Sequence, residues 1–599
     1  MGLLQKAVET YDCHQAYVGK YRDGHTVLAP ICHIVTRANL EITLNQDGLF
    51  CAACAVDKDA PKIIIPATEA SAGRTSGICA HPLCDQLGYL APDKEEKHAA
   101  YMEQLRNWEA SPASHPKLHP ILRYLEGGTI IPDLLRSGLI TWSQSDRQKE
   151  DKLLVRWRII GLEDEQPDAC WEDTTLFSAF IQYYSTQYSN APEGLCLVSG
   201  ETCRIAEQHP KGIIPINGNA KLISSNDKTG FTYLGRFTAE EQAAQVGYEA
   251  SQKAHNALRW LASEQGAQAI YGGRTFLCWN PQERKVPLCT GSFFQSTKAI
   301  TKPSEYREQL QQTLRGFQSS LPQQAGVVIA AFDAATSGRL ALTYYQELLG
   351  SDFLKRLHDW DASCCWPNGK YGIQSPGLRQ IVNGAFGTQQ SEKGKIILKT
   401  DDRVLCQQMQ RLVACRIDKA PMPTDLIKAL YHRASTPLAY DPNIRRTLLF
   451  TACAAIRKYR NDKFKEEWSM NLEPTKADRS YQFGRLLAIL EKVERDTYGS
   501  DEEREPNAIR QQSVFCQRPL YAANNMERQL ERAYFPRLKP NNREYYKRLI
   551  GQIMEEISAF PQEQWNLPLT ETYLMGYYLQ RNALYTAKEH VTTEDEENG

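Results

Sequence analysis

The sequence predicts an α+β protein, with a mixed α/β N-terminal domain over residues 1–380 and an α-helical bundle over residues 381–599. Two observations predict this arrangement. Alternating apolar and polar residues, typical of strands, recur in the first part, and helical spacing of apolar residues dominates the second. A chain of 599 residues also exceeds what one hydrophobic core usually supports. The boundary is placed at a composition shift near residues 375–390, because no linker or internal repeat marks it.

The strands expected in the first part come in turn-connected pairs. Residues 40–44 alternate apolar and polar side chains, NQDG forms a turn, and LFCAACAV follows as the return strand. Residues 155–161, VRWRIIG, predict a strand with one buried and one cationic face. Residues 327–348 predict a strand, a DAATSG turn and a second strand. Between these strands, YEASQKAHNALRWLASEQ, from Tyr248, predicts a helix.

The helical periodicity of the second part is clearest in YQFGRLLAILEKVERD. Its apolar residues are expected on one helical face: Phe483, Leu486, Leu487, Leu490 and Val493. Glu491 and Arg495 are spaced i,i+4, and we expect them to form an ion pair on the exposed side of this helix.

Composition favours a cytoplasmic protein. The 17 cysteines are scattered without a disulfide framework, which fits a reducing compartment. No apolar run is long enough to span a membrane, and the N-terminal MGLLQKAVETYD is expected to form an amphipathic helix rather than a signal peptide. The net charge of −1 neither favours nor excludes nucleic acid, since a basic stripe can lie on a neutral chain.

Four cysteines raise the question of a zinc site. Cys51 and Cys54 are spaced as in a zinc knuckle, and Cys79 and Cys84 follow. However, the first two lie in an expected strand, where an i,i+3 pair points to opposite faces. The second pair lacks the tight spacing of a knuckle. We therefore expect buried apolar cysteines, no metal site and no cofactor.

One dipeptide resembles part of a metal-dependent phosphohydrolase site. His358-Asp359 would need further histidines and an aspartate from other helices, and the bland interpretation is a helix-surface histidine beside an acid. The chain has no phosphate-binding loop of the P-loop type, no G-x-S-x-G elbow and no H-E-x-x-H. We therefore expect no enzymatic activity, with a stand-alone metal-dependent nuclease using these two residues as the alternative.

Three glycine-bearing segments carry side chains suited to nucleic acid. Lysines, amide side chains and exposed backbone amides hold phosphates and read groove edges. The candidate DNA-binding residues in HPKGIIPINGNAKLISSND, from His209, are Lys211, Asn217, Asn219, Lys221 and Asn226. Those in SAGRTSG and YGGRTF are Arg74, Thr75, Ser76, Gly77 and Arg274. The alternatives are polar surface loops and, for Ser76, the cap of a following helix.

Several segments together resemble one family, the large subunit of the type I-C CRISPR surveillance complex (Cascade), also called Csd1-like. They occur in the family's order and run almost from end to end. The segments are SAGRTSGICAHPLCDQLGYL at 71–90, CLVSGE at 196–201, NGNAKLISSND at 217–227, YEASQKAHNALRWL at 248–261, FDAATSGRLALTYYQEL at 332–348, FGRLLAILEK at 483–492 and LMGYYLQR at 574–581. The chain departs from the family in reading Ser224-Ser225-Asn226 where a phenylalanine is common.

The resemblance implies an antiviral ribonucleoprotein subunit near the 5′ end of the CRISPR RNA. It would recognise the protospacer-adjacent motif in target duplex DNA, promote R-loop formation, help hold the displaced single strand and recruit a nuclease-helicase. Its other partners would be the backbone subunits, the subunits that bind the RNA handle and a small helical subunit. The Gly73–Gly77 loop would approach the motif DNA or the RNA-handle subunits, with Arg74 for phosphate. A scaffold that binds RNA alone is a further alternative.

The resemblance also implies that residues 470–599 are made separately as the small helical subunit, by translation from an internal start. The sequence offers its own indication, because Lys465-Glu466-Glu467 can be encoded only by an unbroken purine tract. This tract ends two codons before Met470, a plausible ribosome-binding arrangement in a bacterium. The alternative is an ordinary helix surface followed by an ordinary methionine.

Overall fold

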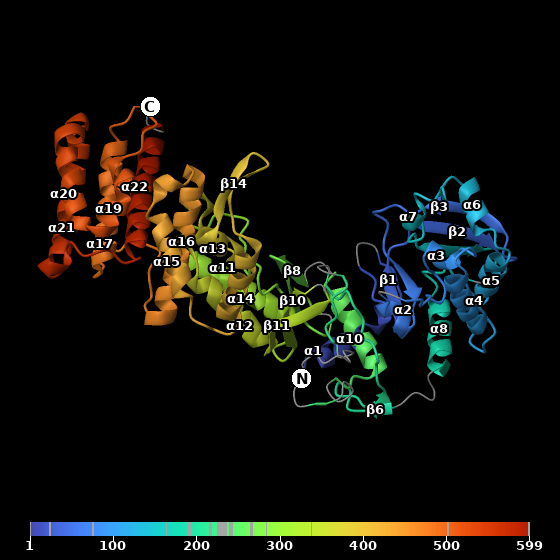
Figure 1. Ribbon diagram of the computed structural model, residues 1–599. Coiled ribbons are helices and arrows are strands. Elements are labelled where there is room, and N and C mark those ends of the chain that lie inside the picture. The colour runs from blue at the N-terminus through green and yellow to red at the C-terminus, as the bar shows by residue number, and fades with distance from the viewer. Residues whose placement is uncertain are drawn as a thin grey trace. The chain divides into compact units, whose positions relative to one another are not determined.

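The computed structural model of the chain divides into two compact units (Figure 1). Unit 1 contains Met1–Val286 and Ala325–Leu348, and unit 2 contains Pro287–Gln324 and Leu349–Gly599. The structure describes residues 2–22, 26–74, 77–162, 165–187, 193–214, 218–224, 237–238, 244–263, 267–282, 284–336, 338–499 and 502–596. The composition shift near residues 375–390 lies within unit 2, at helix α13 (Leu378–Phe386) and hairpin β14–β15 (Thr388–Glu392, Lys395–Lys399).

Unit 1 contains the mixed α and β structure that the sequence predicts. Its described helices are α1 (Leu3–Cys13), α2 (Glu69–Gly73), α3 (Leu87–Leu90), α4 (Glu95–Glu109), α5 (Leu118–Glu126), α6 (Ile130–Arg136), α7 (Arg147–Glu150), α8 (Thr174–Gln187) and α10 (Tyr248–Leu261). Its described strands are β1 (His33–Thr36), β2 (Leu40–Asn45), β3 (Phe50–Ala55), β4 (Ile63–Pro66), β5 (Val155–Ile160), β6 (Glu193–Leu195), β7 (Thr202–Arg204), β8 (Gln268–Tyr271), β9 (Arg274–Trp279), β10 (Gly326–Thr336) and β11 (Arg339–Leu349).

The first sheet has the order β3-β2-β5, with β2 antiparallel to β3 and parallel to β5. The predicted alternation of β5 is confirmed, since Trp157 and its apolar neighbours along the strand are buried. The predicted cationic face is partly neutralised: Arg156 and Arg158 bind the two carboxylate oxygens of Glu41, on the neighbouring strand, at 2.5 and 2.7 Å. Arg156 also lies 3.9 Å from the ring centre of Trp171. These two ion pairs therefore link β5 to β2.

The second sheet has the order β11-β10-β9-β8, and α1 and α10 pack on each other beside it (Figure 1). The predicted strand-turn-strand of residues 327–348 forms β10 and β11, and the helix predicted from Tyr248 forms α10. Leu277 of β9 and Val328 of β10 are fully buried in one apolar cluster with Ala7 of α1 and Leu258 of α10. The apolar faces of the two helices and of the sheet thus bury one another, which stabilises the helices and the sheet.

Unit 2 is mostly helical. Its described helices are α11 (Pro303–Ser320), α12 (Gly350–Ser363), α13, α14 (Asp402–Ile417), α15 (Thr424–Ala434), α16 (Pro442–Phe464), α17 (Arg479–Arg495), α18 (Asn507–Arg510), α19 (Gln512–Gln517), α20 (Pro519–Gln529), α21 (Pro540–Ser558) and α22 (Tyr573–Glu596). Its described strands form two short hairpins, β12–β13 (Trp366–Pro367, Ile373–Gln374) and β14–β15.

Helix α17 is the centre of the C-terminal bundle and packs on α18, α20, α21 and α22. The sequence predicted an apolar face and an exposed polar face, but every residue from Ser480 to Glu494 is buried. The predicted ion pair of Glu491 and Arg495 is confirmed at 2.7 Å, but Glu491 is only 1% exposed, so its predicted place on the outside is wrong. Periodicity missed this because α17 has neighbours on all sides, and its polar residues find partners there.

Two glycines allow α17 and α22 to approach closely. A Cβ atom on Gly484 would overlap the carbonyl oxygen of Tyr573, and one on Gly576 would overlap that of Tyr481. The two helices therefore touch backbone to backbone at this crossing, where no larger residue fits.

Candidate nucleic-acid interface

Lys211 and Lys221 lie opposite each other at the base of a hairpin. They pair in an antiparallel bridge, and the amide of Gly212 donates to the carbonyl of Ala220 at 3.1 Å. Gly212 has a φ of +70°, and a Cβ atom there would lie 2.8 Å from the carbonyl oxygen of Gly218. A glycine is therefore required where the two arms of this hairpin come together.

The hairpin is attached to the open edge of the second sheet. The amide of Lys221 donates to the carbonyl of Gly338 at 3.0 Å, and the amide of Leu340 donates to the carbonyl of Lys221 at 2.9 Å. Half-buried Arg259 of α10 donates to the carbonyls of Gly212 and Lys211, at 3.2 and 2.7 Å. The backbone at the base of the hairpin is thus held from two sides.

The glycine-bearing loop after α2 meets this hairpin. The Lys211 ammonium donates to the carbonyl of Arg74 at 2.8 Å. A Cβ atom on Gly73 would lie 2.5 Å from Oε1 of Gln208 and 3.8 Å from Nζ of Lys221. Two of the three segments singled out in the sequence therefore come together, and Gly73 leaves room for the side chain of Gln208 beside the loop. We call Arg74, Lys211 and Lys221 the cationic cluster.

Charge is crowded in the cationic cluster. Burial, together with the neighbouring charges of Lys221 and Arg74, lowers the pKa of the Lys211 ammonium. Burial also lowers the pKa of Lys221, although the nearby carboxylate of Glu69 acts to raise it. Glu69 binds Arg204 at 2.7 Å and accepts from the amide of Gln208 at 2.6 Å. Because its carboxylate already has these partners, the two lysines keep positive charge that no ion pair between described residues neutralises.

Arg74 has structural partners of its own. Its guanidinium binds both carboxylate oxygens of the fully buried Asp85, at 2.5 and 2.9 Å, and donates to the carbonyl of Cys79 at 2.8 Å. It also lies 4.5 Å from the ring centre of Tyr89. The phosphate contact predicted for Arg74 stays a prediction, and the geometry gives its guanidinium the role of tying the loop to the residues before α3.

The remaining predicted residues are dispersed. Gly77 is exposed with a φ of +87°, and Asn219 is exposed beside the paired Ala220. Arg274 lies on β9, separated from the hairpin by β10 and β11, and is 8% exposed in an ion pair with Asp333 at 2.8 Å. The predicted residues outside the described part of the chain are Thr75, Ser76, Asn217 and Asn226.

Sequence reasoning missed Gln208, Arg204 and Arg259. Gln208 and Arg204 hold Glu69 beside the cationic cluster, and Arg259 fixes the carbonyls at the base of the hairpin. Arg259 is separated from Lys211 by 48 positions in the sequence. No local pattern marks such a contact, although the helical periodicity of α10 could have indicated that this arginine lies near a buried face.

The alternative nuclease residues are neighbours on α12. Nδ1 of His358 lies 3.3 Å from Asp359, whose carboxylate also binds Lys355 at 2.7 Å. Within the described ranges, no group of three or more His, Cys, Asp or Glu residues could hold a metal ion. We expected Cys51 and Cys54 to be buried, and this expectation is wrong. Both are exposed, because β3 lies at the edge of its sheet.

Over residues 9–585 the chain matches a family of CRISPR-associated proteins. It belongs to that family, which is named Cas_Csd1. No curated protein matches the chain. In the part of the chain that the structure describes, no helix is long and apolar enough to cross a membrane.

Proposed function

We propose that this CRISPR-associated protein is the large subunit of a type I-C surveillance complex in the cytoplasm. We propose further that the hairpin base at Lys211 and Lys221, with exposed Asn219, contacts target duplex DNA at the protospacer-adjacent motif. In this role the protein starts strand separation and R-loop formation, helps to hold the displaced strand and recruits a nuclease-helicase. Its other partners are the CRISPR RNA, the backbone and RNA-handle subunits and a small helical subunit. Base pairing by the RNA reads the long target sequence, and the protein reads only a short duplex motif.

The crowding of Lys211 and Lys221 beside Arg74 is the observation that carries this proposal. Keeping like charges close together costs free energy, and a phosphate placed among them offsets that cost. Exposed Asn219 supplies an amide that can donate to groove-edge acceptors. The close backbone approach of Gly212 and Gly218 keeps the base of the hairpin narrow, which suits contact with a groove.

The test is the double variant Lys211→Ala/Lys221→Ala in the assembled complex. We expect target-duplex affinity to fall about tenfold or more, and each lost phosphate contact to reduce the slope of log K against log salt by about 0.9. Fluorescence anisotropy at several salt concentrations measures both quantities. The matched control is Lys58→Ala/Lys62→Ala, which removes two exposed lysines of the same unit. Equal affinities and slopes for the two double variants would show that the hairpin is an ordinary surface loop.

We further propose that the chain has no catalytic activity of its own. The same preparation, incubated with Mg²⁺ or Mn²⁺ and with single- and double-stranded DNA and RNA, should leave all substrates intact. Cleavage that His358→Ala abolishes would establish the nuclease alternative. Binding of RNA without any preference for a duplex motif would establish the scaffold alternative.

We also propose that residues 470–599 are made a second time as a separate small subunit. This segment contains α17 to α22, and α17 packs on four other helices of the same segment, which gives it a core of its own. Recoding Met470→Leu in the gene should remove a small C-terminal product from the purified complex while the full-length chain remains. Met575→Leu is the matched control. Absence of that product from the wild type would contradict the internal start.

A further inference from the structure

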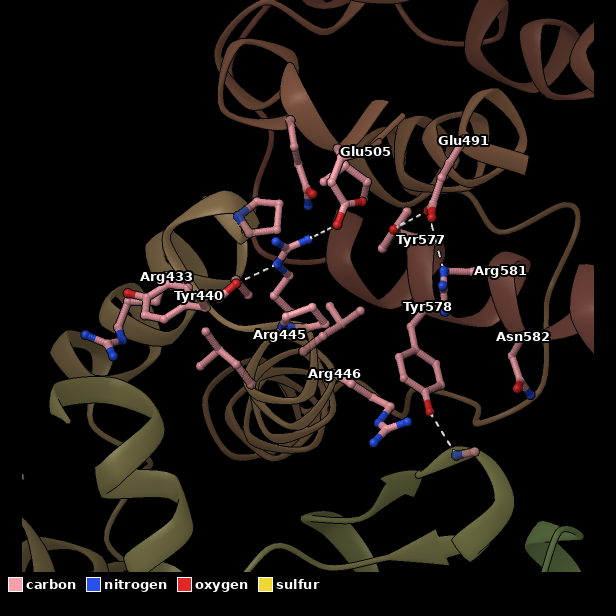
Figure 2. A pocket seen from close by; sticks show the side chains of 18 of the residues that line it. Arg433, Tyr440, Arg445, Arg446, Glu491, Glu505, Tyr577, Tyr578, Arg581 and Asn582 are labelled. Carbon is pink, nitrogen blue, oxygen red and sulfur yellow. Dashed lines mark hydrogen bonds and ion pairs between the residues drawn. The ribbon is translucent and has the colours of Figure 1, made fainter. Parts of the chain in front are cut away.

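Unit 2 contains a cavity of about 360 Å³ bordered by α15, α16, α17 and α22 (Figure 2). Ligand pockets usually begin at about 300 Å³. Its lining includes five arginines and two glutamates, an excess of three positive charges. The arginines are Arg433, Arg445, Arg446, Arg495 and Arg581.

Three of these arginines alternate with the two glutamates. Glu505 binds Arg445 at 2.5 Å and Arg495 at 3.0 Å. Glu491 binds Arg495 at 2.7 Å and Arg581 at 3.4 Å, and it accepts a hydrogen bond from the hydroxyl of Tyr577. Figure 2 shows the contacts of Glu491 with Tyr577 and Arg581, and Arg445 between Glu505 and the carbonyl oxygen of Tyr440.

Glu491 is held as an anion in this chain of ion pairs. Burial acts to raise the pKa of Glu491, but Arg581 and Arg495 outweigh it and hold that pKa below its ordinary value. Burial acts to lower the pKa of Arg581, but Glu491 above all, with Tyr577 and Tyr585, raises it. Three guanidinium groups against two carboxylates still leave one positive charge in the chain.

The other two arginines add to this excess. Arg446 is exposed, and its hydrogen-bond partner is the neutral side chain of Asn443, at 3.2 Å. Arg433 donates to the carbonyl of Gly387 at 2.5 Å, while its buried Nε has no partner in the described part of the chain. Neither forms an ion pair with any described carboxylate. Both therefore keep donors for an anion.

The rest of the wall is aromatic and apolar. Tyr440 lies 5.0 Å from the guanidinium of Arg433, and Tyr578 lies beside Arg446 in Figure 2. Burial raises the pKa of Tyr578 to about 12, so its hydroxyl stays protonated at neutral pH. Leu448 and Ile509 add apolar surface. An anionic ligand with a flat ring would match both the cationic and the apolar parts of this cavity.

We propose that this cavity binds a nucleotide, with its phosphate at Arg446 and its base against the tyrosines and the apolar wall. A ligand held in this way contacts α16 and α22 at once, and so links residues 470–599 to the helices that precede them. The binding does not depend on the hairpin of unit 1. The nucleotide is either a free molecule or one residue of a single strand, and both present the same base and phosphate.

The test is isothermal titration of the full-length chain with adenosine 5′-monophosphate, adenosine and inorganic phosphate. We expect the monophosphate to bind with a stoichiometry of one and the other two to bind at least tenfold more weakly. Arg446→Ala should weaken monophosphate binding about tenfold. The matched control Arg548→Ala, an exposed arginine on α21, should leave it unchanged. Because Arg446 is exposed, its variant is expected to fold, and equal melting temperatures would verify this.

No monophosphate binding by the wild type, or binding that Arg446→Ala leaves intact, would overturn the proposal. Equally tight binding of inorganic phosphate would also overturn it, because the base would then contribute nothing. A 5′-phosphorylated tetranucleotide distinguishes the two sources. If it displaces the monophosphate and depends on Arg446, the cavity accepts a strand. If only the monophosphate binds in an Arg446-dependent manner, the ligand is a free nucleotide.

Discussion

In unit 1, burial lowers the pKa of His33, His81 and His209 to about 4 and that of His255 to about 3, so these side chains are neutral in the folded protein. Helix α17 of unit 2 instead buries the charged Glu491 among arginines that hold it ionised. These groups therefore respond to acid over different ranges. The buried histidines begin to cost stability below their ordinary pKa of 6.5, whereas the paired carboxylate is protonated only below its ordinary 4.5.

The largest expected effect is a selective loss of stability in unit 1 on mild acidification. Between the ordinary histidine pKa of 6.5 and about 4, the unfolded chain binds more protons than the folded one, so stability falls as pH falls. At pH 5.5 this costs on the order of 1 kcal/mol for each buried histidine, and several kcal/mol for all four. The arginines around Glu491 hold its pKa below its ordinary 4.5, so its contribution to stability is lost only as the pH falls below 4.5.

Hydrogen exchange with mass spectrometry at pH 7.5 and 5.5, corrected for intrinsic rates, resolves peptides of each unit. We expect peptides of α10 to lose protection while those of α17 keep it. His255→Leu should reduce the pH dependence of α10, whereas replacement of exposed His432 should not. Equal loss of protection in both helices would contradict the comparison.

A large effect confined to unit 2 is expected for Gly484→Ala. The added methyl group would overlap the carbonyl oxygen of Tyr573, so α17 and α22 must separate, at a cost of about 3 kcal/mol. Gly551→Ala is the matched control, because Gly551 lies at an exposed position of α21 with nothing within 4 Å of its added Cβ. The control should gain about 0.8 kcal/mol from helix propensity. Urea unfolding measures both, and a Gly484→Ala protein as stable as its control would show that the crossing is loose.

A smaller effect in unit 1 is expected for Arg74→Ala. Its removal leaves the carboxylate of Asp85 buried without its guanidinium partner, which costs about 2 kcal/mol. Arg106→Ala breaks the exposed ion pair with Glu126 and should cost less than about 1 kcal/mol. If Arg74→Ala weakens DNA binding without loss of stability, its guanidinium contacts phosphate, as the sequence predicts, rather than tying the loop together.

Local patterns were sufficient to predict the α+β class, strands β2, β5, β10 and β11, and helices α10 and α17. They also indicated the glycine-bearing segments on either side of the cationic cluster. They could not show that Arg156 and Arg158 bind Glu41, because these residues lie 115 and 117 positions from it in the sequence. Local patterns also could not show that Arg74 forms an ion pair with Asp85, since a loop has no periodicity from which to infer contacts.

The sequence by itself determined which elements form, because strand and helix periodicities reflect backbone geometry within a few residues. It also determined the family, through segments that occur in a recognisable order. Only the tertiary structure decided which charges are neutralised. Arg445 meets Glu505 across 60 positions, and Tyr577 meets Glu491 across 86. The pKa of a side chain and the ligand that a cavity accepts depend on such distant neighbours and on burial, and both arise only when the chain has folded.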